Sequence, residues 1–379
     1  MAIPYGKQHI TESDIQAVAE TLRSDYLTGG PRIAQFEEAF ASYIGAKYAV
    51  AVANGTAALH LCAMSLGVKP GDKIITTPNT FAASANCVLY CGGEIDFADI
   101  DPHTLLLDPN LVEDKLRHAP KGTYQGIIPV DFAGMPVNLE DFRTLADKYG
   151  CWLLEDACHA PGGYFTDSQG KDQWCGNGAF ADLAIFSFHP VKHIACGEGG
   201  MITTHDEDHY RRLLRLRTHG ITRERDLLHE DHGGWYYEML DLGYNYRLSD
   251  IHAALGWSQL QRADQGLARR RHLAQRYDAA FAGTNVHPPL PHPGHAYHLY
   301  VVQINDRKGL YEHLRKKGIF AQVHYIPVHY QPYYQQLGWK KGDFPHTEAY
   351  YARCLSLPLY PALTDGEQEF VIRSVMEFV

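Results

Sequence analysis

The sequence has 379 residues, of which 45% are hydrophobic and 21% are charged, and its formal net charge is −10. This composition indicates a folded protein with a sizeable core, organised as one large domain and a smaller one. The acidic balance argues against a general nucleic-acid binder and against a peripheral membrane protein, because both need a basic face.

The N-terminal residues and the cysteines indicate a cytoplasmic protein. Residues 1–7 contain no apolar segment of a secretory signal, and no run of about 18 apolar residues is present to span a bilayer. Cys62, Cys87, Cys91 and Cys151, four of the eight scattered cysteines, lie in apolar surroundings. We expect reduced core residues rather than a disulfide framework.

Apolar runs of strand length alternate with helical patterns through the first 250 residues. The predicted strands are Tyr48–Val52, Lys73–Thr77, Gly126–Val130, Cys151–Glu155 and the run that opens at Ala184, and the predicted helices are Thr56–Leu66, Phe81–Tyr90 and Asn138–Tyr149. Near-continuous apolar strands separated by helices indicate an α/β fold with a large, mostly parallel sheet covered on both faces.

From Ser249 the pattern changes to one long predicted helix, Ser249–Ala282, with Ser249 as its cap. The Pro/His-rich stretch Val286–Pro293 follows and cannot be helical. Its histidines alternate with prolines in no ligand spacing, so we predict a solvated linker and no metal site.

The C-terminal part shows the order strand, helix, strand. The three predicted elements are Tyr297–Ile304, Arg307–Lys317 and Ala321–Tyr325. This order indicates a small α+β domain. The predicted domains are therefore residues 1–248 and residues 249–379.

Lys192 stands in the segment Ala184–Gly200, between an apolar run and a glycine turn, with no acidic residue next to it. An ammonium group is costly to bury, so we expect the pKa of Lys192 to fall. A neutral amine is what covalent attachment to a carbonyl cofactor requires. For a lone lysine, a surface position after a strand is the more common interpretation, and only partners elsewhere in the chain favour the functional one.

Asp156 follows directly on the predicted strand Cys151–Glu155, where it can reach the crevice in which α/β sheets bind ligands. There its carboxylate could hold the ring nitrogen of pyridoxal phosphate protonated. His159, three residues on, could touch the phenolic oxygen or the ring face of that cofactor. Both residues keep an alternative, since Asp156 could cap a helix and His159 could be structural.

Hydroxyl groups and a glycine turn suit a phosphate group. Asn54-Gly55-Thr56 joins a strand to a helix, and free N–H groups with the Thr56 hydroxyl favour an anion at the helix N-terminus. Ser187 precedes Lys192 by five residues and could contact the same phosphate. Phe81 could stack on the cofactor ring, although an isolated phenylalanine is more often a core residue.

The motifs in order resemble the DegT/DnrJ/EryC1/StrS family of nucleotide-sugar aminotransferases over nearly the whole chain. They are Asn54–Leu59, Glu155–Ala157, Ser187–Lys192, Gly197–Gly200 and Gly243–Asp250. The resemblance implies fold type I of the pyridoxal phosphate enzymes and a homodimer with shared active sites. It identifies Lys192 with the Schiff-base lysine and Asp156 with the pyridinium partner.

The resemblance also implies the remaining cofactor contacts. Thr56, Ala57 and Ser187 match phosphate contacts, and Asn245 matches an asparagine that reaches the cofactor phosphate of the neighbouring subunit. His159 stands where many members have glutamine, and Phe81 stands at a position often held by a stacking aromatic residue.

Within the family, the sequence is most similar to the aminotransferases of pseudaminic acid biosynthesis. That branch implies a UDP-linked 4-keto-6-deoxy-N-acetylhexosamine as substrate, L-glutamate as amino donor, and a product aminated at C4. The sugar-nucleotide contacts would fall on Tyr5, Asp25, Tyr26, Leu27, Thr28, Ala57, Ser187, Asn245, His324, Tyr325, Ile326 and Pro327.

Three alternatives remain beside this prediction. One is an aminotransferase for another UDP- or dTDP-linked keto sugar, of the bacillosamine, 4-amino-arabinose or dTDP-amino sugar type. A second is the 3-dehydratase branch of the family, where histidine replaces the lysine; here the aligned residue is Lys192, which disfavours it. The third, a non-catalytic cofactor-binding regulator, is disfavoured because the lysine, the aspartate and the phosphate loop occur in one chain.

Overall fold

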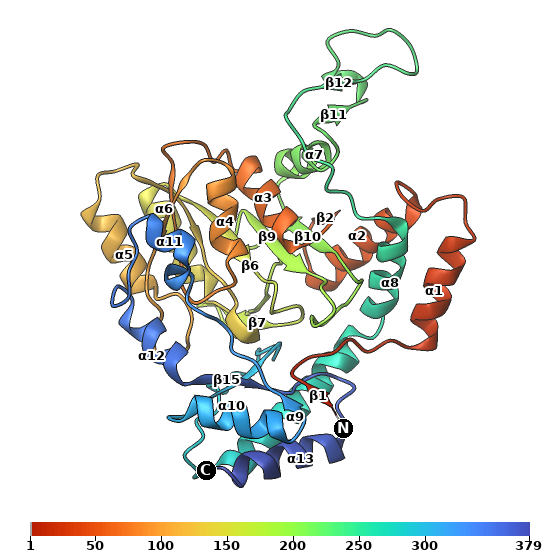
Figure 1. Ribbon diagram of the computed structural model, residues 1–379. Helices are drawn as coiled ribbons and strands as arrows, with labels where there is room; N and C mark the ends of the chain where they lie inside the picture. The colour runs from red at the N-terminus through yellow and green to blue at the C-terminus, as the bar shows by residue number, and fades with distance from the viewer. Residues whose placement is uncertain (1) are drawn as a thin grey trace.

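The computed structural model describes residues 2–379 and has a seven-stranded sheet at its centre (Figure 1). Its strands, in spatial order, are β2 (Tyr48–Val52), β10 (Gly200–Thr204), β9 (Leu183–Ser187), β6 (Trp152–Asp156), β5 (Tyr124–Ile128), β3 (Lys73–Thr76) and β4 (Glu94–Phe97). All neighbours pair in parallel except β10, which runs antiparallel to both β2 and β9. The predicted α/β fold with a mostly parallel sheet is confirmed.

Side chains alternate between the two faces of the sheet, as the period of two in a strand requires. Ile74, Ile128 and Leu154 pack into one apolar core, while Ile75, Ile127 and Leu153 pack into another. The first core contains residues of α3 (Gly55–Ser65), α4 (Ala83–Tyr90) and α7 (Glu207–Leu216). The opposite face is covered by α5 (Pro109–His118), α6 (Leu139–Tyr149), α2 (Pro31–Ile44) and α8 (Asp250–Leu260).

The predicted single helix Ser249–Ala282 is wrong, because the chain forms two helices there. α8 ends at Leu260, and α9 (Ala263–Phe281) begins after a break at Gln261 and Arg262. Arg262 leaves helical geometry and its guanidinium binds Asp14 at 2.6 Å, in α1 (Glu12–Leu22). Ser249 caps α8 as predicted, since its Oγ accepts a hydrogen bond from the backbone N–H of His252.

The C-terminal elements are β13 (Tyr300–Gln303), α10 (Arg307–Lys316), β14 (Ile319–Phe320), η3 (Val328–Tyr330), α11 (Pro332–Gln336), α12 (Pro345–Arg353), β15 (Cys354–Leu357) and α13 (Asp365–Met376). Three of them, η3, α11 and α12, add Val328, Tyr334 and Tyr350 to the two cores of the sheet. The other five surround a separate apolar core. This core also takes in α9 and Ile3, because β1 (Ile3–Pro4) pairs with β14. The domain border at 248/249 stays a prediction.

The predicted strand Ala321–Tyr325 is wrong. Only Gln322 bridges to Ser356, and the strand in this region is β14, two residues earlier. From residue 323 the chain leaves the sheet edge, and His324 and Tyr325 line a cavity instead. The Pro/His-rich stretch Val286–Pro293 is non-helical and mostly exposed, in agreement with the prediction.

A hairpin arm, which we define as residues 221–242, stands away from the body of the molecule (Figure 1). It contains β11 (Ile221–Thr222), η2 (Arg225–Leu227) and β12 (Glu238–Met239). Three short elements lie elsewhere in the chain, namely η1 (Phe132–Gly134), β7 (Tyr164–Thr166) and β8 (Asp172–Trp174).

All eight cysteines are free, and Cys62, Cys87 and Cys151 are buried. Within residues 2–379, no helix combines the length and apolarity needed to cross a membrane.

Candidate active site

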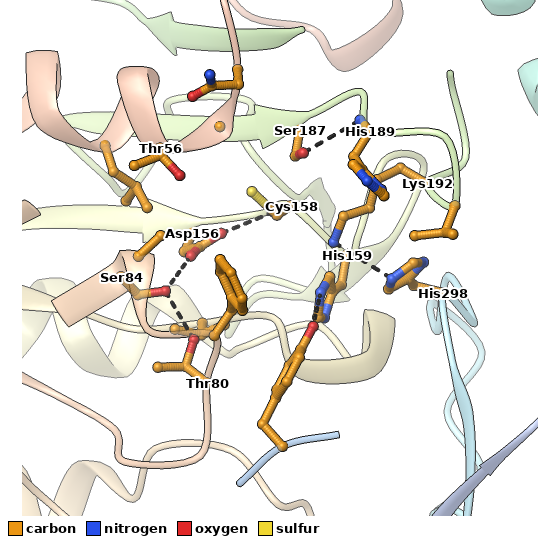
Figure 2. A pocket seen from close by; sticks show the side chains of 18 of the residues that line it. Thr56, Thr80, Ser84, Asp156, Cys158, His159, Ser187, His189, Lys192 and His298 are labelled. Atoms are coloured by element: carbon orange, nitrogen blue, oxygen red, sulfur yellow. Dashed lines mark hydrogen bonds between the residues drawn. The ribbon is translucent and has the colours of Figure 1, made fainter. Parts of the chain in front are cut away.

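The carboxyl ends of β6 and β9 and the N-terminus of α3 open onto one cavity of about 420 Å³ (Figure 2). Its lining includes Lys192, Asp156, Thr56 and Ser187. Open α/β sheets bind ligands beyond the carboxyl ends of their strands, so the fold places these side chains where a ligand is expected.

Lys192 lies in the turn that follows β9. Its backbone N–H donates to His189 O at 2.8 Å, and its Nζ lies 3.5 Å from Nε2 of His298. Burial lowers the pKa of Lys192, while the nearby Cys158 and Asp156 oppose that shift. The side chain therefore favours the neutral amine more than an exposed lysine does.

Asp156 ends β6 and is 5% exposed. Ser84 Oγ, on α4, donates to Asp156 Oδ2 at 2.6 Å, and the backbone N–H of Cys158 donates to Oδ1 at 3.2 Å. Ser84 Oγ also pairs with Thr80 Oγ1 at 2.8 Å. These contacts fix the carboxylate in a buried position that faces the cavity, so it suits a cationic group on a ligand.

The N-terminus of α3 forms the phosphate corner, which we define as Gly55, Thr56, Ala57 and Ser187. Asn54 caps the helix, and its Oδ1 accepts from the backbone N–H of Ala57 at 2.8 Å. A Cβ on Gly55 would lie only 3.0 Å from Cβ of Ser187, so glycine lets β9 approach the helix. The first N–H groups of a helix together with two hydroxyls form a ready site for an anion.

His159 is buried, and both of its ring nitrogens have partners. Its Nδ1 accepts from the backbone N–H of Ala133 at 3.2 Å, so neutral His159 carries its proton on Nε2, 3.2 Å from Tyr325 Oη. Burial and the charge of Lys192 hold the pKa of His159 well below its usual range. The exposed ring of Phe81 lies across the cavity mouth, with its centroid 6.0 Å from that of Tyr325.

Comparison with known proteins decides the family, because the model of the DegT/DnrJ/EryC1/StrS aminotransferase family matches residues 8–376. The chain belongs to this family. It is 40% identical over 388 residues to the spore coat polysaccharide biosynthesis protein SpsC of Bacillus subtilis (strain 168), covering 100% of this chain and 97% of SpsC.

Two solved structures show the same fold. PseC of Helicobacter pylori, an aminotransferase involved in the biosynthesis of pseudoaminic acid, has a TM-score of 0.90 at 31% identity, covering 100% of this chain and 99% of that one. Spr1654 of Streptococcus pneumoniae, solved in a PLP form, has a TM-score of 0.89 at 28% identity, covering 100% of both chains. As a family member, the chain is a sugar aminotransferase of fold type I that depends on pyridoxal 5′-phosphate.

The residues of the cavity fit this cofactor. Its phosphate suits the phosphate corner, its ring nitrogen suits the Asp156 carboxylate, and its aldehyde suits the Lys192 amine. Glycine at position 55 keeps the phosphate corner open, because a Cβ there would lie 3.0 Å from Cβ of Ser187. The cofactor predicted from sequence is thereby confirmed for the family.

The structure gathers many of the predicted site residues in one place but leaves others outside. The predicted residues that line the cavity are Lys192, Asp156, His159, Thr56, Ser187, Phe81, Tyr5, His324 and Tyr325. Ala57 is buried and does not line the cavity, and its backbone N–H donates to Asn54 Oδ1. Ile326 lines an adjoining cavity, and Asp25, Tyr26, Leu27, Thr28, Pro327 and Asn245 line neither. The individual roles of all these residues stay predictions.

Sequence reasoning missed three contributors, Ser84, Cys158 and His298. Ser84 and Cys158 bind Asp156, and His298 contacts Lys192. Cys158 directly follows the motif Glu155–Ala157 that marks Asp156, so its proximity to this motif was the available signal. Ser84 and His298 reach the site from distant parts of the chain and carry no local pattern.

Proposed function

We propose that this enzyme transfers the amino group of L-glutamate to C4 of a UDP-linked 4-keto-6-deoxy-N-acetylhexosamine. The product would be UDP-4-amino-4,6-dideoxy-N-acetyl-β-L-altrosamine, a precursor of pseudaminic acid. The observation that carries the proposal is that Lys192, Asp156 and the N-terminus of α3 line the same cavity. The likeness to H. pylori PseC supports the choice of sugar.

Lys192 and Asp156 take the chemical roles. When bound, pyridoxal 5′-phosphate supplies the electron sink for breaking the C–H bond of the amino donor. Lys192 Nζ is the covalent anchor, takes the proton from Cα of glutamate in the first half-reaction and gives one to C4 of the sugar in the second. Asp156, held by Ser84 and the Cys158 amide, keeps its negative charge fixed at the far end of the cavity.

The shape of the surface supports a large second substrate. A neighbouring cavity of about 360 Å³ is lined by Tyr5, Phe81, Tyr325 and Ile326, three of which also line the first cavity. In this proposal the keto sugar occupies the first cavity near Tyr5 and His324, and the nucleotide extends past Ile326 and Pro327. The aromatic lining suits the apolar faces of sugar and base.

The hairpin arm supports a homodimer in which the subunits share their active sites. Trp235 and Leu242 on the arm are 75% and 76% exposed, and Met239 is 62% exposed. Large exposed apolar side chains on a projecting segment are typical of a surface that binds another protein, because binding removes them from water. Asn245 and the exposed segment Asp25–Thr28 would then complete the site of the partner subunit.

A second candidate is an aminotransferase for another UDP- or dTDP-linked keto sugar. The 40% identity to SpsC, a spore coat polysaccharide biosynthesis protein, favours it. Incubation with glutamate and a panel of UDP- and dTDP-4-keto sugars, followed by NMR of the products, separates the two. Turnover of dTDP sugars alone would overturn the proposed substrate.

The role of Lys192 has its own test. We expect Lys192→Ala protein, saturated with pyridoxal 5′-phosphate, to lack the visible absorbance of the attached cofactor and to lose transamination. A Lys192→Ala variant that keeps both would contradict the assignment.

A further inference from the structure

His298 lies beneath the catalytic lysine and belongs to none of the motifs that mark the site. Its Nε2 is 3.5 Å from Lys192 Nζ, and its ring is 4.3 Å from that of His159 by centroids (Figure 2). The side chain is 4% exposed and precedes β13, far in sequence from Lys192. Within residues 2–379, Nδ1 of His298 has no hydrogen-bond partner, so the imidazole bonds only to the amine at the centre of the proposed chemistry.

The backbone that presents His298 is strained. Tyr297 has φ 49°, a left-handed conformation that is rare for an aromatic residue. His295 Nδ1 accepts from the Tyr297 N–H at 2.8 Å and so helps to hold this turn. A Cβ on Gly134 would lie 2.7 Å from Tyr297 N, so the turn also needs a glycine opposite it. Strain of this kind persists where the surroundings enforce it, and it is typical of functional sites.

A buried arginine holds the same turn from behind. Arg270 is 1% exposed, and its Nη1 donates to the carbonyl oxygens of Tyr297 at 3.3 Å and of His298 at 3.2 Å. The same Nη1 donates to Leu359 O at 3.0 Å, so all three of these acceptors are backbone carbonyls. Burial lowers the pKa of Arg270 to about 10. A costly buried cation is thus used to fix the main chain on either side of the His298 Cα.

We propose that His298 is a positioning residue for Lys192: its Nε2 holds the free side-chain amine whenever that amine is not bonded to the cofactor, and Arg270 and the Tyr297 turn hold His298 in place. The proposal rests on the proposed role of Lys192. Lysine has a flexible four-carbon stem, and misplacement of a reacting group by about 1 Å can cost a hundredfold in rate.

The electrostatics agree with a neutral contact. Burial and the charge of Lys192 hold the pKa of His298 well below its usual range, so the imidazole stays uncharged beside the amine. A neutral Nε2 that accepts from Nζ–H leaves the lone pair of Nζ free for the reacting carbon. His159, His193 and His324 also face this region, and burial lowers the pKa of each, so none adds a positive charge near neutral pH.

The test measures attachment of the cofactor rather than turnover. Cofactor-free full-length protein is mixed with pyridoxal 5′-phosphate, and the rate at which the visible absorbance of the attached cofactor appears is followed. We expect His298→Ala and His298→Leu to attach the cofactor about ten- to a hundredfold more slowly, with the same final absorbance, because neither side chain can accept a hydrogen bond from Nζ. Added imidazole should restore part of the rate in His298→Ala but not in His298→Leu, where the side chain fills the space.

Two further variants make the outcome decisive. His329→Gln removes a fully buried imidazole that bonds Glu348 and does not line the cavity, so it should attach the cofactor at the wild-type rate. Wild-type rates in both His298 variants, or equal slowing in His329→Gln, would overturn the positioning role. If instead Lys192→Ala keeps the visible absorbance, the proposed covalent role of Lys192 is refuted. This result differs from wild-type rates in the His298 variants, which would refute only the positioning role of His298.

Discussion

Buried neutral histidines near the active site should make the protein sensitive to mild acid, and His295 allows this to be measured. His295 is 1% exposed, and burial lowers its pKa to about 3 from the ordinary 6.5. Between these two values the unfolded chain binds a proton that the folded chain does not. Stability from this group is therefore present above about pH 6.5 and is lost as the pH falls toward 3.

The magnitude follows from linkage. At about pH 5.5, one unit below the ordinary pKa, a histidine that stays neutral when folded lowers the free energy of unfolding by about 1.4 kcal/mol relative to pH 7.5. Burial also lowers the pKa of His159, His193, His298 and His324, so their contributions have the same sign. Burial raises the pKa of the Asp131 and Glu155 carboxyls, which act in the opposite direction, so a single substitution is more informative than the total.

The perturbation is His295→Asn, and the assay is proton uptake on thermal unfolding, measured by calorimetry in buffers of different ionisation enthalpy. Asparagine Oδ1 can still accept from the Tyr297 N–H, but it does not titrate. We expect uptake at about pH 5.5 to fall by about 0.9 proton. The control is His229→Asn, which removes a side chain that is 80% exposed. Equal uptake in His295→Asn and wild type would refute the reasoning.

Three other substitutions test the site, the break between helices and the arm. Gly55→Ala adds a Cβ 3.0 Å from that of Ser187, so we expect the fold to persist and the apparent Kd for pyridoxal 5′-phosphate to rise about tenfold, measured by absorbance titration. Asp14→Asn breaks a pair with Arg262 in which Asp14 is fully buried, and should lower the free energy of unfolding by about 3 kcal/mol in denaturant titrations; a loss under about 1 kcal/mol would contradict this. Leu242→Glu should dissociate the proposed dimer in sedimentation experiments, whereas Leu290→Glu, at a site 46% exposed outside the arm, should not.

Five of the seven strands of the sheet could be predicted from sequence because they are largely apolar, whereas β10 and β4, which contains Glu94 and Asp96, were not predicted. β2 and β3 lie within one residue of their predicted bounds, and α6 begins directly after its predicted first residue, Asn138, which caps it. Each of these signals is local, since it depends on residues within one strand or one helical turn. The family motifs are local in the same sense and placed Lys192 and Asp156 on one cavity.

The errors arose where distant residues decide the structure. No proline or glycine marks the break between α8 and α9, and the contact at the break joins Arg262 to Asp14, 248 positions away. His298 reaches Lys192 across 106 positions, and Ser84 reaches Asp156 across 72. Helical periodicity contains no information about such contacts, which depend on how the helices and the sheet pack.

The two ends of the cavity are supported by different parts of the fold. Asp156 is held by Ser84 on α4 and by the turn after β6, so its position depends on the central sheet and one covering helix. Lys192 follows β9, but its amine contacts the segment that leads into β13, which Arg270 fixes from α9. Cofactor affinity and lysine reactivity therefore depend on separate contacts. Substitutions at Gly55 should change the first with little effect on the second, and substitutions at His298 should do the reverse, because within residues 2–379 no group hydrogen-bonds to both the Asp156 carboxylate and the Lys192 amine.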